Sequence, residues 1–159
     1  MYSVGDGADV EVYSGDRFSD DMLCYGINVA ARLLTSHLAR VLTPMSLAPG
    51  QVPALLALHE FDGQTQADLA RRTSVEQPTM AITLRRMERD GLIYRTADGD
   101  DARKTRLHLT PTGRAVIDPL QSARGLIDSV ALRGLTESQL ETLTAVINTI
   151  VDNLTEPNT

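Results

Sequence analysis

The sequence has 159 residues, with 15 basic and 21 acidic side chains and a net charge of −6. That length suits one or two compact domains, and the acidic balance argues against a protein that coats nucleic acid without selectivity. A single cysteine excludes a disulfide framework, no apolar run reaches the roughly 18 residues of a membrane span, and the first residues lack the features of a secretory signal, so we expect a cytoplasmic protein.

The amino-terminal part predicts a flexible arm, residues 1–18, followed by two helices. The tripeptide Ser19-Asp20-Asp21 provides an acidic start for a helix that should continue to about Leu42. Its apolar residues recur at helical spacing: Leu23, Ile27, Ala30 or Ala31, Leu34 and Leu38. Two prolines then lead into a second, apolar helix, which should begin near Val52 and end near Phe61.

Two helix-start signals stand close together in the middle of the chain. In Thr65-Gln66-Ala67-Asp68 a hydroxyl is followed three residues later by an acid, the pattern of an N-terminal capping box. Ser74-Val75-Glu76-Gln77 repeats that pattern nine residues further on. Because the two starts are so close, the first helix must be short and end in a turn near Thr73, which is the arrangement of a helix-turn-helix.

The second of these helices has one apolar face and one outward face. Met80, Leu84 and Met87 recur at spacings of four and three residues and predict the buried face. A projection at about 100° per residue identifies the residues on the opposite side and its flanks. These are Pro78, Ile82, Arg85, Arg86 and Arg89, with Thr79 and Ala81 at the edges. Three arginines on this face indicate a surface that faces a DNA groove.

A two-stranded ribbon should follow that helix. Residues 92–96 and 103–109 alternate between apolar and polar side chains and predict its two strands, and the polar residues 97–102 predict the turn between them. Arg103 and Lys104 lie at the tip, where a basic side chain can reach the phosphates or the minor groove of flanking DNA. Asp98 and Asp100 add negative charge there, which should reduce the affinity of the tip for phosphate.

The rest of the chain predicts two more helices. One begins near Thr112 and runs toward Arg133, with Pro119 either kinking it or marking its first turn. Thr136-Glu137-Ser138-Gln139 is another capping box. The last helix carries a narrow apolar seam of the kind that pairs helices of two subunits: Leu140, Leu143, Ile147, Ile150 and Leu154. The predicted fold class is therefore mainly α with a small β-hairpin wing, a winged helix-turn-helix joined to a helical dimerisation region.

Several segments carry a family resemblance as a group: Leu69-Ala70-Arg71-Arg72, Val75-Glu76-Gln77-Pro78-Thr79, Gly91-Leu92-Ile93, Asp101-Ala102-Arg103 and Leu109-Thr110-Pro111-Thr112-Gly113. Over roughly residues 20–153 the chain resembles the MarR family of transcriptional regulators, and its Glu-Gln-Pro-Thr segment is most similar to the SlyA branch. The resemblance implies an obligate homodimer. Each protomer would carry a winged helix, residues 48–110, and contribute residues 19–47 and 111–159 to the dimerisation region.

The projection and the resemblance together assign the DNA-contacting residues. Those expected to face bases lie at the start of the second short helix: Gln77, Pro78, Thr79, Ala81 and Ile82. Those expected to contact bases or phosphates are its arginines: Arg85, Arg86 and Arg89. In the wing, Arg103 would enter the minor groove with Lys104 beside it, and Asp101 would support the tip. SlyA-like helices usually carry an arginine where this chain has Ile82, which cannot hydrogen-bond a guanine but can touch a thymine methyl group.

Charge is distributed unevenly along the chain. Between Arg71 and Arg106 the sequence has nine of its fifteen basic residues and six acids, a local charge of +3 that leaves −9 for the remainder. A basic segment on an acidic body favours one directed DNA-binding face over uniform attraction to nucleic acid.

Enzymatic and metal sites have little support in the sequence. The three histidines, His37, His59 and His108, are scattered, and no glycine-rich phosphate loop or nucleophile motif is present. The sequence also has no His-x-x-x-His or Cys-x-x-Cys pair. We therefore expect no catalytic residue, no metal and no cofactor.

Cys24 suggests a redox alternative. Leu23-Cys24-Tyr25 resembles the Leu-Cys-Phe of the OhrR-type peroxide sensors in the same family. The tyrosines that hold the sulfur in those sensors fall on Asn28 and Leu38 here, which favours a structural role as a small buried side chain on an interface helix.

Many relatives bind phenolic or other small anionic ligands between the dimer helices and the winged helix. By position, His37 and His59 would border such an effector pocket, with Arg86 nearby. The sequence therefore predicts a homodimeric transcriptional regulator, a repressor of a pseudo-palindromic double-stranded DNA operator with half-sites about one helical turn apart, released by a small-molecule effector. The alternatives are redox sensing through Cys24 and a winged-helix protein-interaction module without its own operator.

Overall fold

The computed structural model describes residue 18, residues 22–99, residue 101 and residues 103–155. The expected arm, apart from Phe18, and the expected acidic helix start at residues 19–21 therefore lie outside the described residues. Contacts divide the chain between Leu33 and Leu34 into two units, and each is described by itself. Helix α1 (Leu23–Leu42) begins in the first unit and ends in the second.

In the first unit, the ring of Phe18 packs against the start of α1. It meets Tyr25 edge-on, with 5.9 Å between ring centroids. A Cβ atom at Gly26 would lie only 3.0 Å from the Phe18 ring, so the absence of a side chain at Gly26 permits this close packing. The apolar residues Leu23 and Ile27, which belong to the predicted stripe, are exposed.

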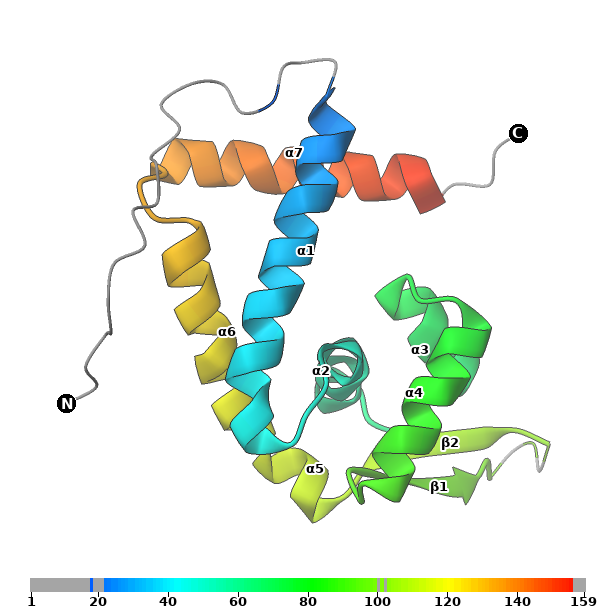
Figure 1. The fold of residues 1–159 in the computed structure, drawn as a ribbon. Helices are drawn as coiled ribbons and strands as arrows, with labels where there is room; N and C mark the ends of the chain where they lie inside the picture. The colour runs from blue at the N-terminus through cyan, green and yellow to red at the C-terminus, as the bar shows by residue number, and fades with distance from the viewer. Residues whose placement is uncertain (1–17, 19–21, 100, 102, 156–159) are drawn as a thin grey trace. The chain divides into compact units, whose positions relative to one another are not determined.

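The second unit contains the other helices and a two-stranded antiparallel sheet (Figure 1). After α1 its elements are η2 (Thr43–Met45), η3 (Pro49–Gln51), α2 (Val52–Glu60), α3 (Gln66–Thr73), α4 (Gln77–Arg89), β1 (Ile93–Ala97), β2 (Thr105–Leu109), α5 (Pro111–Ala115), α6 (Ile117–Ala131) and α7 (Glu137–Thr155). The expected fold class, mainly α with a β-hairpin wing, is confirmed. Among the described residues no single helix is long and apolar enough to cross a membrane. Only the bent pair Leu23–Met45 and Pro49–Glu60, taken together, has the length and the apolar composition of a span.

The core of this unit forms around α2, which contacts α3 on one side and α6 on the other (Figure 1). Fully buried side chains come from α2, α3, α4, β2 and α6: Leu55, Leu58, Leu69, Met80, Leu84, Met87, Leu107, Leu109, Ile117 and Leu120. The predicted apolar face of α4 is therefore confirmed. Each large apolar side chain buried in this way contributes about 1.5–3 kcal/mol, and together they fix α4 on the body of the winged helix.

The wing pairs β1 with β2 in a register that sets Tyr94 opposite His108 and Ile93 opposite Leu109. Strand β1 is displaced by one residue from its predicted range of 92–96, and β2 begins two residues later than predicted, because the residues at their expected starts belong to turns. The Leu92 amide N–H donates to the Met87 carbonyl at the end of α4. At the tip, the Lys104 N–H donates to the Asp101 carbonyl, so residues 103 and 104 lie in the turn.

The turn between α3 and α4 lies at Thr73 and Ser74 as predicted, but the predicted role of Ser74 is wrong. Ser74 does not start α4; it has a left-handed backbone, φ 53°, and its N–H donates to the carbonyls of Ala70 and Arg71 at the end of α3. Helix α4 instead begins at Gln77, with Pro78 in its first turn, where a proline loses no helical hydrogen bond. A serine before a short polar run is compatible with either helix end, so the local sequence alone did not distinguish them.

The predicted helix from Thr112 to Arg133 is two helices, α5 and α6, which meet at Val116. Pro119 lies in the first turn of α6, one of the two positions expected for it. Thr110 caps α5 by accepting from the Gly113 N–H, and its hydroxyl donates to the Gly91 carbonyl at 2.6 Å. A Cβ atom at Gly113 would lie 2.0 Å from the Leu92 carbonyl oxygen, so only glycine allows α5 to pack this closely against the start of the wing.

Helix α7 begins with the expected capping box: Gln139 N–H donates to the Thr136 hydroxyl, and the Thr136 N–H donates to the Gln139 side chain. None of its residues is buried in the single chain. Ile147 is 49% exposed and Leu154 is 80% exposed. The apolar seam of α7 is therefore only partly covered within the described chain.

Candidate nucleic-acid interface

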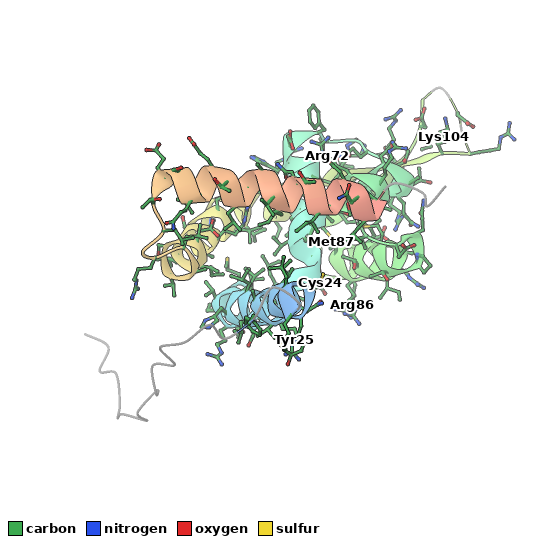
Figure 2. All side chains as sticks on the ribbon, turned by 90° about the horizontal axis from the view of Figure 1, so that it is seen from above. Cys24, Tyr25, Arg72, Arg86, Met87 and Lys104 are labelled. Carbon is green, nitrogen blue, oxygen red and sulfur yellow. The ribbon has the colours of Figure 1, made fainter. Side chains whose placement is uncertain are left out.

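The outward face of α4 carries the residues that the sequence assigned to DNA. Ile82 is 47% exposed, Ala81 is partly buried, and the other assigned residues are exposed: Gln77, Pro78, Thr79, Arg85, Arg86 and Arg89. Figure 2 shows Arg86 extending away from α4 while Met87 lies on its inner side. Packing of Met80, Leu84 and Met87 into the core thus leaves the opposite face open to solvent.

Acidic partners occupy most of the basic side chains around this face. Seven of the nine basic residues between positions 71 and 106 lie within 3.9 Å of a carboxylate: Arg71 with Asp68, Arg72 with Glu60, Arg89 with Asp90, Arg95 with Glu88, Arg103 and Lys104 with Asp101, and Arg106 with Asp98. Each such pair lowers the net positive charge available to a phosphate.

Arg85 and Arg86 are the two exceptions. Arg85 Nε donates to the Ala81 carbonyl one helical turn earlier, and neither guanidinium has a carboxylate partner among the described residues. Both side chains are exposed on the outward face of α4. They are therefore the basic groups of this helix most available to a DNA phosphate or to a guanine edge.

Arg89 is held by a network that begins in the core. The buried Gln51 accepts a hydrogen bond from the Ala48 N–H and donates one to the Asp90 carboxylate at 3.2 Å. The other oxygen of Asp90 accepts from Arg89 Nε at 2.9 Å. The start of α2 and the end of α4 are thus joined by side chains, and the Asp90 carboxylate offsets part of the positive charge that Arg89 offers to a phosphate.

The wing tip presents two basic side chains next to one carboxylate. Arg103 is 96% exposed, and its Nε lies 3.8 Å from Asp101 Oδ1. Lys104 Nζ lies 3.9 Å from Asp101 Oδ2, and Asp101 also accepts from the Arg103 N–H. Figure 2 places Lys104 at the projecting end of the wing. The side chain of Asp101 thus contacts both basic residues that it was expected to support.

Asp98 has a different role from the one expected. Its side chain is 4% exposed and pairs with Arg106 Nε at 2.6 Å, rather than adding free negative charge to the surface. Its other oxygen accepts from the Asp101 N–H, and its own N–H donates to the Lys104 carbonyl. Burial and pairing of Asp98 therefore shape the tip and weaken the repulsion that the sequence suggested.

The base of the wing is fixed by Asp62, in the turn between α2 and α3. One of its oxygens accepts from the Leu109 N–H at 3.0 Å, and the other lies 2.9 Å from Arg114 and 3.2 Å from His108 Nδ1. Partial burial raises the pKa of Asp62, but the hydrogen bonds from Leu109 and His108 and the charges of His108 and Arg114 outweigh it and leave the pKa below its ordinary value. The ionised carboxylate thus joins the α2–α3 turn, β2 and α5.

The beginning of α3 carries the predicted capping box. Asp68 accepts from the Thr65 hydroxyl and N–H, and the Asp68 N–H donates to the Thr65 hydroxyl. These hydrogen bonds, followed by the charge of Arg71, lower the pKa of Asp68. Gln66, the residue after Thr65, contacts α4: its Nε2 donates to the Gln77 Oε1 at 3.4 Å.

His37 and His59 are exposed, and neither side chain has a hydrogen bond to the described part of the chain. An open groove of about 390 Å³ is lined by residues at the start of α7 and just before it: Leu135, Ser138, Gln139, Thr142, Leu143 and Val146. Cys24 is a free, exposed thiol. No group of three metal-ligating side chains occurs among the described residues.

Sequence reasoning missed Gln66, Asp62 and the buried role of Asp98. Asp98-Gly99 has the composition of a turn start, which offered a local signal for a structural aspartate. Asp62-Gly63 has the same composition, but neither Asp62 nor Gln66 gave a signal for its partners, because these lie on other elements.

The chain matches one family model and is similar to several solved structures. The family model described as the MarR family matches residues 42–104. The crystal structure of the transcriptional regulator SlyA is 28% identical, with a TM-score of 0.81, and the match covers 87% of this chain and 96% of that one. A probable transcriptional regulator from Pseudomonas aeruginosa is 30% identical, with a TM-score of 0.75, and the match covers 82% of this chain and 98% of that one. A MarR family regulator from Listeria monocytogenes complexed with a 26mer DNA is 24% identical, with a TM-score of 0.77, and the match covers 82% of this chain and 87% of that one.

Proposed function

The chain belongs to the MarR family of transcriptional regulators, and from this we propose that it is a homodimeric repressor that binds a pseudo-palindromic operator through α4 and the wing. The family consists of regulators rather than enzymes. A regulator of this kind shares a compartment with the chromosome, so the proposal includes a cytoplasmic location.

The observation that carries the proposal is the exposure of Arg85 and Arg86 without acidic partners on the outward face of α4. A recognition helix in the major groove contacts base edges with its N-terminal residues and phosphates with its basic side chains. In this arrangement Gln77, Thr79 and Ile82 face bases, and Arg103 reaches the flanking minor groove. Because neighbouring basic groups already have carboxylate partners, a small number of free arginines supplies most of the phosphate attraction.

Exposed apolar residues on the carboxy-terminal helices support the proposed dimerisation. Leu126 and Val130 of α6 and Val146, Ile147 and Val151 of α7 are all exposed in the single chain. An apolar seam of this length is the usual signature of an interface between helices. A second copy of the chain would cover it, and two-fold symmetry would set the two recognition helices about one DNA turn apart.

The test is a gel shift with purified protein and the intergenic DNA that flanks its own gene, at two salt concentrations. Saturable binding that survives competitor DNA and weakens with salt is the expected result. The double variant Arg85→Ala/Arg86→Ala should lose the shift while keeping its circular dichroism spectrum. A selection from random DNA sequences covers the case of a distant operator, and failure to enrich any sequence there would overturn the proposal.

Control by a small effector is the second part of the proposal, and it rests on the family's ligand-binding members. His37 and His59 are exposed and offer imidazoles to an anionic or phenolic ligand. A screen of such compounds for release of the shifted complex tests this, with the double variant His37→Ala/His59→Ala as a check on the site. Release of DNA that is equally strong in the variant would assign the effector to another place.

Two alternatives are tested in the same assay. Redox control through Cys24 predicts that peroxide releases DNA from the wild type and not from Cys24→Ser; we expect both proteins to keep binding, since Asn28 donates to the Cys24 carbonyl and not to its sulfur. A protein-interaction module without an operator would give no sequence enrichment in the random-DNA selection.

A further inference from the structure

We propose that Gln66 is a positioning residue that holds the amide of Gln77 in the orientation that reads an adenine of the operator. The inference rests on the proposed function and adds a specificity to it. Its basis is the hydrogen bond from Gln66 Nε2 to Gln77 Oε1, 3.4 Å long, between the first residues of α3 and α4.

The position of this pair suits a contact to a base. Gln77 is the first residue of α4, exposed, and lies at the end of the helix that contacts base edges when a recognition helix enters the major groove. Gln66 is only partly exposed and lies at the start of a helix whose end is fixed by the Ser74 turn. The Thr65–Asp68 capping box fixes the backbone of the first turn of α3, which includes Gln66.

The hydrogen bond defines which edge of Gln77 remains for DNA. An amide oxygen has two lone pairs, so the bond from Gln66 leaves one available, and the Gln77 Nε2 has no acceptor among the described residues. Gln77 therefore presents one acceptor and one donor side by side. Adenine offers the complementary pair in the major groove, N6 as donor and N7 as acceptor, whereas guanine offers two acceptors there.

Without Gln66, the amide of Gln77 can rotate by half a turn and exchange its donor and acceptor positions. A freely rotating amide can donate to guanine O6 or N7 as well as pair with adenine. The role of Gln66 is thus to disfavour the second orientation, which keeps the hydrogen bond only if both amides turn over together, and this costs the competing bases affinity without adding a contact to DNA. Gln66 itself has no need to touch the operator.

The experiment first selects an operator from random DNA with the wild-type protein. Dissociation constants are then measured by fluorescence anisotropy for operators carrying each of the four bases at every half-site position. The proteins compared are the wild type, Gln77→Ala, Gln66→Ala and Gln66→Glu. Gln121→Ala, which makes the same chemical change at an exposed position of α6, is the matched control.

We expect the wild type to prefer adenine at one position by about tenfold. Gln77→Ala should lose that preference, and Gln66→Ala should reduce it at the same position, with adenine and guanine then bound within about threefold of each other. Gln66→Glu can only accept a hydrogen bond from Gln77, so it should turn the amide over and also lose the adenine preference. Gln121→Ala should match the wild type, and all variants should melt at the wild-type temperature because the bond is exposed.

Full adenine preference in both Gln66 variants, with its loss in Gln77→Ala, would overturn the positioning role and leave Gln77 as the reader. No change at any position in Gln77→Ala would overturn the inference altogether while leaving operator binding intact. A wild-type protein that enriches no sequence would instead be the failure of the proposed function.

Discussion

Nδ1 of His108 on β2 lies 3.2 Å from the carboxylate of Asp62 in the α2–α3 turn, although 46 residues separate the two in sequence. Nε2 of the same ring lies 3.0 Å from the Thr96 hydroxyl on the neighbouring strand, and the ring stacks on Tyr94 with 5.2 Å between centroids. The wing is therefore attached to the helical body at its base by side chains on one face of the sheet.

Asp62→Asn should loosen this attachment. The asparagine keeps the size of the side chain but removes the charge that pairs with Arg114 and His108, and its amide nitrogen cannot accept a hydrogen bond. We expect the free energy of unfolding to fall by about 1–2 kcal/mol, as for other hydrogen bonds to charged groups at partly exposed positions. Urea denaturation measures the change, and Asp128→Asn on the exposed face of α6 is the control. Equal stability of the two variants would contradict the role of Asp62.

Stability should decline at acid pH because Asp62 and Asp68 have lowered pKa values in the folded protein. Each carboxylate contributes stability that is fully present above its unfolded pKa of 3.8 and is lost as the pH falls through the lower folded pKa. Denaturation curves from pH 6 to about pH 2.5 should show this decline. It should be shallower in Asp62→Asn and shallower still when Asp68→Asn is added. An unchanged slope in the double variant would assign the acid sensitivity to other carboxylates.

Removal of one free arginine of α4 should reduce the salt dependence of binding. Arg85→Ala eliminates a phosphate contact that no carboxylate partner compensates, so affinity should fall for all sequences and the slope of log K against log salt should drop by about one. Arg124→Ala, on α6, makes the same change in net charge at an exposed position and should leave the slope unchanged. Equal effects of the two substitutions would indicate attraction by total charge rather than by a DNA-binding face.

The wing tip should contribute through Arg103. Arg103→Ala removes a side chain that is 96% exposed and only loosely paired with Asp101, so folding should be unaffected. Binding should weaken across sequences, with the largest loss for operators whose flanks have a narrow, A·T-rich minor groove. Titrations against operators that differ only in their flanks measure this, and an affinity equal to that of the wild type on all of them would reject the wing contact.

A charge in the apolar seam of α7 should separate the subunits. Ile147→Asp places a carboxylate in the middle of the face that a second copy is proposed to cover, and burying an unpaired charge there costs several kcal/mol. Sedimentation velocity should report a dimer for the wild type and a monomer for the variant, with operator binding lost as well. Glu141→Asp, a conservative change on the same helix, should remain dimeric. A dimeric Ile147→Asp protein would place the interface elsewhere.

The local sequence was sufficient for much of the fold. The capping boxes at Thr65 and Thr136, the buried face of α4 and the hairpin after Gly91 all appear where the residue pattern predicted them. Each of these signals acts over a few residues along the chain, through a cap, a helical repeat or an alternating strand, so neighbouring residues contain the whole interaction. The same local patterns carried the family resemblance.

Other features depend on partners from distant elements and appear only in the folded chain. Ser74 closes α3 instead of opening α4, Asp98 is buried against Arg106 across the hairpin, and Gln66 meets Gln77 where two helices begin. Seven of nine basic residues near α4 are paired, which the net charge of the segment could not reveal. The residue pattern of α4 is enough to predict which of its residues face outward, because helical periodicity is local. Only the fold decided which of their charges remain free, because a carboxylate neutralises an arginine by its distance in space and not by its distance along the chain.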